Sequence, residues 1–236
     1  MIWRIVPVSY WAVVGLIRLC LVLYVKGPKI DGLENVPKHG GAILVSNHLN
    51  NADPCIIPGI CKRRIVIMAK KEMFKWPLVS LAFRLIGSFP VDRQGADLAA
   101  LREAQNVVHD GMLLLMFPEG TRSRDHQLHR GFPGTALVAY RTGAPIIPIG
   151  ITGTENVPWP WVFFKPFMGP RVTVSIGKPF YPPKAERITS QAAKDATDDI
   201  MRHIAELLPE EYRGEYRDGS PPAVAAAAQE AGSAST

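Results

Sequence analysis

Hydrophobic positions along the chain follow two patterns, short unbroken apolar runs and longer stretches with a helical period. The unbroken runs are bounded by glycine, proline or charged residues, which is typical of buried strands. They cover residues 40–47, 64–69, 88–93, 112–116 and 144–153, and a further strand is predicted over residues 171–180, where apolar and polar positions alternate. The segments between them predict helices near residues 54–60, 76–87, 97–111, 134–143 and 188–204. Because strands alternate with helices, the sequence predicts an α/β fold with a mostly parallel mixed sheet flanked by helices.

The N-terminal residues carry a different pattern, an apolar run over residues 5–25 that is interrupted only by Arg18. The run lacks a small-residue cleavage site, which argues against a signal peptide, and a mid-run arginine disfavours a helix that spans the bilayer. We expect an N-terminal apolar membrane-associating helix in one leaflet, with Arg4, Arg18 and Lys26 reaching toward headgroups. A core helix of the domain is the alternative.

Composition divides the chain into three predicted parts and narrows the possible partners. The parts are a membrane-associating segment (1–28), the main domain (29–213) and an Ala/Ser/Gly/Pro-biased tail expected to be disordered (214–236). The net charge of +6 suits phosphate esters, an anionic membrane or nucleic acid. The basic residues are scattered and 47% of residues are hydrophobic. Both features favour a lipid as the partner, and no nucleic-acid partner is expected. The cysteines have neither disulfide nor zinc spacing, so no metal is expected.

A histidine and an aspartate stand five residues apart in VSNHLNNADP, between a predicted strand and a predicted helix. Five residues turn an ideal helix by about 500°, so His48 and Asp53 cannot share a helix face. Instead, Asp53 and Pro54 are typical of an N-cap and first helical residue, and Asp53 could fold back toward His48. Without a serine nucleophile motif, such a pair fits a general base acting on a substrate hydroxyl. The alternative is an ordinary helix cap beside a loop histidine.

The stretch FPEGTRS, residues 117–123, follows an apolar strand and therefore lies where α/β sheets place their sites. Gly120 lets the backbone approach a ligand closely. Thr121 and Arg122 are donors suited to phosphate, the arginine through a bidentate fork. Glu119 could accept from a sugar or glycerol hydroxyl, or orient an arginine. The alternative is a surface turn with a Glu–Arg pair.

Two further segments complete a series in chain order. GSFPVDR ends at Arg93, a second possible phosphate donor, and two prolines bracket the apolar strand APIIPIGI. Together with NHLNNAD and FPEGTRS, these segments resemble the conserved blocks of the phospholipid/glycerol acyltransferase family over residues 30–185. One departure is Asn50, where many members have serine, and it bears on the packing of the loop alone.

The resemblance implies an O-acyltransferase in which His48 deprotonates the acceptor hydroxyl and Asp53 orients His48. The hydroxyl would attack the thioester of acyl-CoA or acyl carrier protein, with no other cofactor. From 1-acylglycerol 3-phosphate the product would be phosphatidic acid. The resemblance also implies an acceptor-binding group made of Arg93, Glu119, Gly120, Thr121 and Arg122. The two arginines of this group would hold the acceptor phosphate.

The expected location is the cytoplasmic face of the cell membrane, with a lysophospholipid acceptor, the acyl donor and the membrane surface as partners. The tryptophans of VPWPWVFFKPF suit a membrane interface or a loop packed on the core. Glycerol 3-phosphate or another lysolipid could replace the acceptor. A non-catalytic lipid- or phosphate-binding protein is the alternative, but binding alone needs no His48–Asp53 pair. Cys55 is disfavoured as an acyl-carrying nucleophile, because it lies in an apolar helix.

Overall fold

The computed structural model describes residues 7–25, 28–75, 77–92, 97–157, 169–182 and 188–218. A seven-stranded sheet runs through these residues in the order β1-β7-β6-β2-β5-β3-β4. The strands are β1 (Lys29–Asp31), β2 (Ala42–Ser46), β3 (Ile65–Lys70), β4 (Phe89–Val91), β5 (Leu113–Met116), β6 (Ile146–Thr152) and β7 (Thr173–Ile176). The α-helices are α1 (Pro7–Val25), α2 (Asp53–Ile60), α3 (Pro77–Leu85), α4 (Leu98–His109), α5 (Gly134–Thr142) and α6 (Ser190–Glu206). The 3-10 turns are η2 (Leu33–Asn35), η3 (Lys71–Lys75), η4 (Thr154–Asn156), η6 (Glu210–Tyr212) and η7 (Gly214–Tyr216).

The sheet is mixed but mostly parallel, as the alternation of strands and helices predicts. The five neighbouring strands from β6 to β4 all run parallel, β7 runs antiparallel to β6, and β1 pairs in parallel with β7. Parallel neighbours require crossover connections, and α3 supplies one between the neighbouring strands β3 and β4. Strand β1 has only three residues, too few to show a hydrophobic period, and was not predicted from the sequence.

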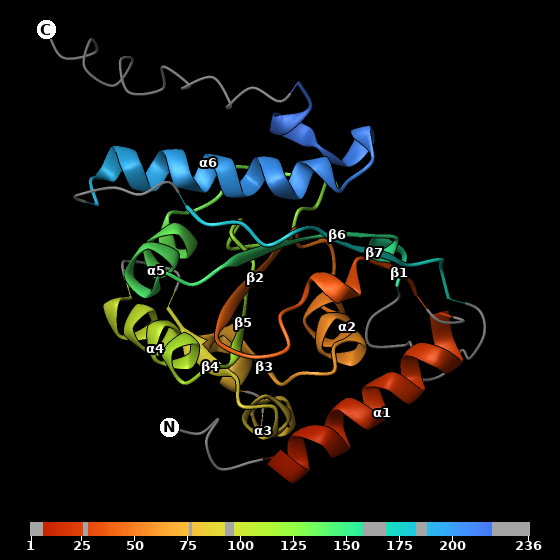
Figure 1. Cartoon of the computed structure of the whole chain (residues 1–236). Coiled ribbons are helices and arrows are strands. Elements are labelled where there is room, and N and C mark those ends of the chain that lie inside the picture. The colour runs from red at the N-terminus through yellow and green to blue at the C-terminus, as the bar shows by residue number, and fades with distance from the viewer. Residues whose placement is uncertain are drawn as a thin grey trace, which may run out of the picture.

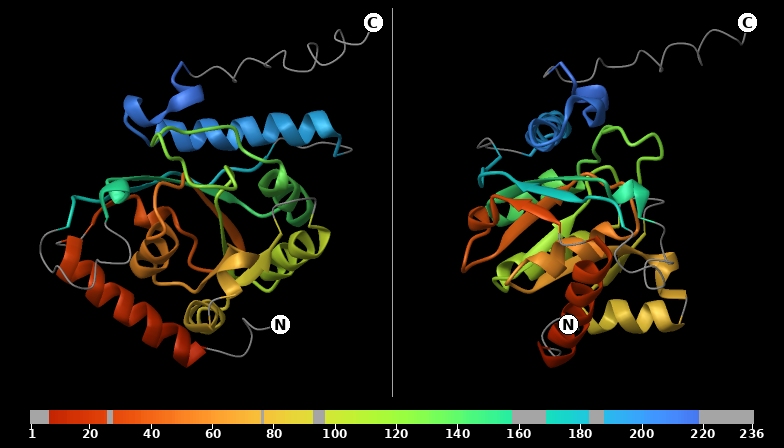
Figure 2. Two further views of the ribbon diagram at one scale, coloured as in Figure 1. Left: turned by 180° about the vertical axis from the view of Figure 1, so that it is seen from behind. Right: turned by 90° about the vertical axis from the view of Figure 1, so that its right-hand side faces the viewer.

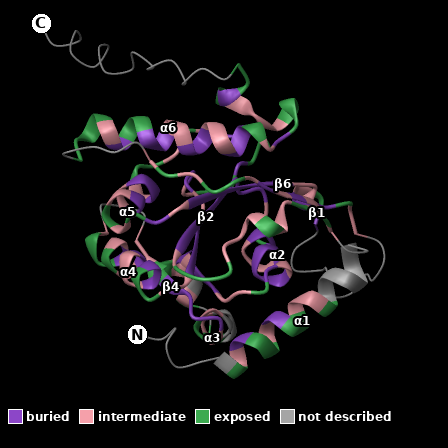
Figure 3. Cartoon of the chain, viewed as in Figure 1, coloured by how far each residue is buried: buried purple, intermediate pink, exposed green. Residues whose placement is uncertain are grey.

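Helices cover both faces of the sheet, so that the strands lie in the middle of three layers (Figure 1). Helices α4, α5 and α6 pack on one face against Ile43 and Val45, among others, while α1, α2 and α3 cover Ala42 and Leu44 on the other. Because successive side chains of a strand point to opposite faces, β2 contributes to both layers. Burial on both faces explains why the central strands β2, β5 and β6 are mostly apolar, whereas the burial of β7 alternates along the strand (Figure 3).

Helix α4 packs through small residues rather than through the face that its leucines indicate. The period of Leu98, Leu101, Gln105 and Val108 predicts their common face, yet Leu98 is 56% exposed. The buried positions are Ala100, Ala104, Val107 and Val108. The alanines allow the helix axis to approach the sheet closely, and this close packing overrides the pattern of large apolar residues.

Helix α1 docks on the domain through residues spaced four apart. Tyr10 and Val14 are fully buried, and the Tyr10 hydroxyl accepts a hydrogen bond from the backbone N–H of Ile65 (3.0 Å). Arg18, the next residue on this face, donates from Nε to the carbonyl of Gly59 (2.8 Å) and from Nη2 to that of Cys61 (2.7 Å). One face of α1 is therefore part of the core.

These contacts correct the expectation that Arg18 reaches toward headgroups. The guanidinium instead satisfies carbonyls at the end of α2, where a helix leaves acceptors without intrahelical partners. A cation is also favourable at this negative end of the helix dipole. Arg4 and Lys26, for which the same expectation was made, lie outside the described residues.

The opposite face of α1 is apolar and open to solvent. Leu16 is 60% exposed and Leu19 55%, with Val8 and Trp11 also exposed on this helix and Leu81 exposed on α3. Helix α3 contacts α1, and the two lie along the same side of the molecule in Figure 1. Within the described part of the chain, no helix combines the length and apolar character needed to cross a bilayer.

The folded part of the chain continues beyond the predicted boundary at residue 213. Turns η6 and η7 follow α6, and Tyr216 is buried. The description ends at residue 218, so the remainder of the predicted tail, 219–236, lies outside the described residues. The aromatic segment of residues 158–168 lies outside them as well.

Candidate active site

The polar residues selected from the sequence gather at the carboxyl edge of the parallel strands. His48 follows the end of β2 by two residues, and Glu119 follows the end of the neighbouring β5 by three. The entry to the His48 loop is fixed by Asn47, whose side-chain amide donates to the carbonyl of Ile151 (2.9 Å) and accepts from its N–H (2.8 Å). Two adjacent strands therefore deliver His48 and Glu119 to one place, as expected for a parallel sheet.

His48 and Asp53 form a buried hydrogen-bonded pair. The Nδ1 atom of His48 lies 2.8 Å from Oδ2 of Asp53, and the same oxygen accepts from the backbone N–H groups of Leu49 and Asn50, each at 2.8 Å. Asp53 is fully buried and His48 is 7% exposed. The carboxylate is therefore held by three donors of its own loop, and its position is set before any substrate arrives.

The fold-back of Asp53 toward His48 is present, but the predicted N-cap role of Asp53 is wrong. Asp53 is the first residue of α2, and the N-cap is Ala52, which has no capping side chain. The Asp53 carboxylate turns back over the loop, where Oδ2 accepts from the three donors of residues 48–50. Pro54 lies in the first turn of the helix, as predicted, where its missing N–H is tolerated.

The two ring nitrogens of His48 differ in their hydrogen bonding. Its hydrogen bond to a carboxylate assigns the ring hydrogen to Nδ1, so Nε2 carries the lone pair. One ring face stacks on Phe117, with centroids 4.2 Å apart and an interplanar angle of 26°. The imidazole is thus oriented by Asp53 and Phe117, and Nε2 is the atom that can take a proton from a substrate.

Glu119 is buried next to the His48 backbone, and both of its carboxylate oxygens accept hydrogen bonds from backbone groups. Oε1 accepts from the N–H of His48 (3.2 Å) and Oε2 from the N–H of His129 (3.1 Å). Burial raises the pKa of Glu119 to about 7, against the opposing effect of these two hydrogen bonds. Neither hydrogen bond joins Glu119 to an arginine; both join it to backbone N–H groups of loops, and its contact with a sugar or glycerol hydroxyl stays a prediction.

The other predicted acceptor residues lie at the surface of the same loop. Thr121 and Arg122 are exposed, and Gly120 has φ +65°, a conformation that favours glycine. A Cβ at Gly120 would lie 2.9 Å from Cδ2 of Phe132, so glycine also makes room for this ring. Arg93 lies outside the described residues.

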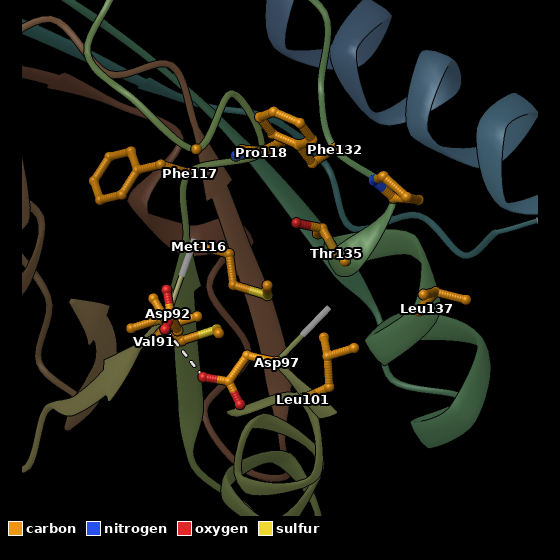
Figure 4. A pocket seen from close by; sticks show the side chains of 14 residues that line it. Val91, Asp92, Asp97, Leu101, Met116, Phe117, Pro118, Phe132, Thr135 and Leu137 are labelled. Atoms are coloured by element: carbon orange, nitrogen blue, oxygen red, sulfur yellow. Dashed lines mark hydrogen bonds between the residues drawn. The ribbon is translucent and has the colours of Figure 1, made fainter. Parts of the chain in front are cut away.

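A cavity of about 490 Å³ opens on the side of Phe117. Figure 4 shows the side chains that line it. Its lining is largely apolar and includes Met68, Val91, Leu101, Met116, Phe132 and Leu137. Phe117 lines one side of it and also stacks on His48, so the cavity adjoins this histidine. The cavity could not be predicted from the sequence, because its walls come from β3, β4, α4, β5 and α5, and no local signal marks such a meeting of distant segments.

Neither a nucleophilic cysteine nor a metal cluster accompanies the pair in the described part of the chain. Desolvation, followed by the nearby charge of Asp53, raises the pKa of the Cys55 thiol to about 11. A thiol with this pKa holds its proton and is a poor nucleophile at neutral pH. Among the residues described, no three potential metal ligands come together.

Comparisons with known proteins agree with this geometry. A family model described as "Acyltransferase" matches residues 27–152. The chain is 31% identical to the 1-acyl-sn-glycerol-3-phosphate acyltransferase of Borreliella burgdorferi over 147 residues, which are 60% of this chain and 59% of that protein. It is 30% identical to the enzyme of the same name from Bacillus subtilis over 132 residues, 55% of this chain and 65% of that protein. The matched region thus spans less than two thirds of these relatives' own length.

The architecture also matches a solved structure. The crystal structure of the 1-acyl-sn-glycerophosphate acyltransferase of Thermotoga maritima superposes with a TM-score of 0.62 at 25% sequence identity. The match covers 86% of this chain and 84% of that one. The predicted α/β fold with a mostly parallel sheet flanked by helices is therefore confirmed.

Proposed function

Because the chain belongs to the acyltransferase family, we propose that it transfers an acyl group from a thioester to the free hydroxyl of 1-acylglycerol 3-phosphate, giving phosphatidic acid. The observation that carries this proposal is the buried contact of 2.8 Å between Nδ1 of His48 and Oδ2 of Asp53 at the carboxyl edge of the sheet. The names of the curated relatives supply the acceptor. Acyl-CoA and acyl carrier protein are both compatible donors.

In the proposed reaction, Nε2 of His48 takes the proton of the acceptor hydroxyl as the oxygen attacks the thioester carbonyl. Asp53 stabilises the imidazolium that forms, through the hydrogen bond to Nδ1. Collapse of the tetrahedral intermediate breaks the carbon–sulfur bond, and the departing thiolate takes the proton from His48. A thioester is already activated, so no acyl-enzyme intermediate is required, in agreement with the protonated state of Cys55.

We assign the acceptor phosphate to the exposed end of the FPEGTRS loop. Arg122 would provide a bidentate fork, with Thr121 as a further donor and Arg93 as a second cation. The FPEGTRS loop, which presents Thr121 and Arg122, is tied to the proposed base, because the N–H of Ser123 donates to the carbonyl of His48 (2.8 Å). The apolar cavity beside Phe117 suits the hydrocarbon chain of a substrate.

We further propose that the exposed apolar face of α1 contacts the membrane, at its cytoplasmic face where thioester donors are available. Leu16 and Leu19 are exposed, while Tyr10 and Val14 on the other side of the helix are buried in the core. Deleting residues 1–25 would remove both the exposed apolar face and the side chains that pack in the core. The sharper test replaces Leu16 and Leu19 by serine and measures flotation with vesicles that contain anionic phospholipid.

Loss of vesicle binding by the Leu16→Ser/Leu19→Ser variant, with unchanged thermal unfolding, is the expected result. The matched control is Tyr181→Ser, which removes an exposed aromatic side chain outside α1 and should bind vesicles like the wild type. Undiminished binding by the double variant would contradict a role for this face.

The activity itself is tested with purified protein, lysophosphatidate and each donor in turn, with product identified by mass spectrometry. Formation of phosphatidate by the wild type but not by His48→Ala is the expected result. Transfer to glycerol 3-phosphate or another lysolipid alone would change the acceptor and keep the enzyme class. Binding of lysophosphatidate without turnover from either donor would indicate a non-catalytic lipid-binding protein.

A further inference from the structure

The segment of residues 209–217, here called the C-terminal strap, packs against the loop that follows β5 (Figure 2). Leu128 in this loop is buried, and both of its backbone polar groups bind the strap. Its N–H donates to the carbonyl of Tyr212 (2.8 Å), and its carbonyl accepts from the N–H of Glu215 (3.2 Å). Without the strap, these buried groups of Leu128 would lose their partners.

Hydrogen bonds continue from Leu128 to the base. The next residue, His129, donates its N–H to Oε2 of Glu119 (3.1 Å), and Oε1 of Glu119 accepts from the N–H of His48 (3.2 Å). From the other side, the N–H of Ser123 donates to the carbonyl of His48 (2.8 Å). Both backbone polar groups of His48 therefore bind the loop that the strap holds.

The strap is itself fixed at points away from the site. Tyr216 is buried, and its hydroxyl lies 3.3 Å from Oδ1 of Asp198 on α6. The Tyr212 hydroxyl donates to Oε1 of Glu155 in η4 (2.8 Å). A further contact, the ion pair between Glu215 and Arg130 (3.0 Å), joins the strap to the loop itself. The strap thus connects α6 and η4 to a loop that has no helix or strand of its own between residues 117 and 133.

We infer that the C-terminal strap is a positioning segment for the acyl-transfer site, which holds His48 in register through Leu128, His129 and Glu119. In this arrangement Glu119 is a positioning residue and does not touch the acceptor. The inference rests on the proposed function, because it assigns to the strap a part in orienting the proposed base. A displacement of about 1 Å in a catalytic group can lower turnover roughly a hundredfold, so a distant segment can affect rate in this way.

Gly214→Ala tests the inference at the point of closest approach. Gly214 has φ +50°, and a Cβ on this residue would collide with the carbonyl oxygen of Leu128. The substitution should push the strap away from the loop. The matched control is Gly143→Ala, which forces alanine into a similar left-handed conformation (φ +62°) with nothing within 4 Å of the new Cβ. Both variants carry the same kind of backbone strain, but only the first presses on Leu128.

We expect Gly214→Ala to lower kcat roughly tenfold to a hundredfold with KM for both substrates nearly unchanged, and Gly143→Ala to retain the wild-type kcat. A second readout needs no activity: the downfield proton resonance of the His48 Nδ1–H bound to Asp53 should shift or broaden in Gly214→Ala only. If the wild type transfers no acyl group, the proposed function fails while this resonance still tests the positioning. Equal kcat and equal spectra for the two variants would overturn the inference.

Should Gly214→Ala fail to fold, Glu119→Gln tests the same connection from its other end. The amide keeps the shape of the side chain but can accept only one of the two backbone hydrogen bonds. The expected result is a fall in kcat with the KM for the acceptor unchanged, and a shifted His48 resonance. A rise in the acceptor KM with an unchanged kcat would show that Glu119 contacts the acceptor, which contradicts a positioning role.

Discussion

Two pairs of residues at the same sheet edge, His48–Asp53 and Thr121–Arg122, lie in opposite environments. The first pair is buried and held by several hydrogen bonds, whereas the second is exposed on the loop surface. The difference corresponds to the two tasks proposed for them. A base must be oriented before the substrate arrives, because misorientation slows the chemical step directly. Donors for a charged headgroup must instead remain open to the solvent from which the headgroup comes.

The largest expected effect comes from the buried pair. His48→Ala should lower kcat by roughly 10²- to 10⁴-fold, because the general base is lost. Asp53→Asn should cause a comparable loss, since a neutral amide no longer stabilises the imidazolium. The Asn variant should fold, because Oδ1 of Asp53 has no hydrogen-bond partner among the described residues and an amide nitrogen can occupy its place.

Steady-state kinetics of both single variants and the double variant check this prediction. The double variant should be little worse than either single one, because the two residues act as a unit. Circular dichroism and urea unfolding control for damage to the fold. A folded His48→Ala protein with near-normal kcat would contradict the proposed difference between the buried and exposed pairs, since the buried pair would then have no catalytic role.

The exposed pair should respond in KM and not in kcat. Arg122→Ala should raise the KM for lysophosphatidate by roughly tenfold to a hundredfold, the expected loss for a charge-assisted hydrogen bond to phosphate, with little change in KM for the acyl donor. Arg122→Lys should recover only part of the affinity, because a point charge replaces a planar fork. Arg124→Ala, another exposed arginine of the same loop, is the control. Equal effects on both substrates would indicate a disturbed fold.

A smaller effect concerns the pH dependence of stability, to which the buried Glu119 contributes. The pKa of Glu119 is raised by burial from 4.5 to about 7, so between these values the folded state binds more protons than the unfolded state. Stability from this group therefore falls as the pH rises from 4.5 to 7. Relative to the wild type, Glu119→Gln should gain on the order of 3 kcal/mol of unfolding free energy between pH 4.5 and pH 8. Urea unfolding at both pH values measures it, and a constant difference would contradict the prediction.

The smallest effect is expected at Cys55, which has no role in the proposed reaction. Cys55→Ala should leave kcat within about twofold of the wild type, because a partly buried free cysteine behaves as a small apolar side chain. The thiol is near Asp53 but holds its proton. Loss of turnover in a folded Cys55→Ala protein would indicate an acyl-cysteine intermediate, which trapping with labelled donor and mass spectrometry would detect.

Sequence reasoning was sufficient where the signal is local. The apolar runs located most strands, and the five-residue spacing of His48 and Asp53 indicated their fold-back contact, because a loop between a strand and a proline-marked helix has few alternatives. It failed where the partner is distant in the chain. Arg18 binds carbonyls 41 and 43 residues away, and Glu119 binds a backbone group 71 residues away, and neither contact leaves a local pattern. The direction of β7 was likewise beyond reach, because it depends on how the chain returns to the sheet.

The pairing of β1 with β7 has a consequence for the order in which the protein can be completed during synthesis. Lys29 lies opposite Thr173, so this edge of the sheet cannot close until most of the catalytic domain has left the ribosome. Helix α1, in contrast, finds α2 within the next few dozen residues. Non-local pairing of this kind is slow, because a long loop must close before any contact compensates for the lost chain entropy. The nascent chain can therefore bring α1 and α2 together, with an apolar face of α1 still exposed, well before β1 has its partner strand.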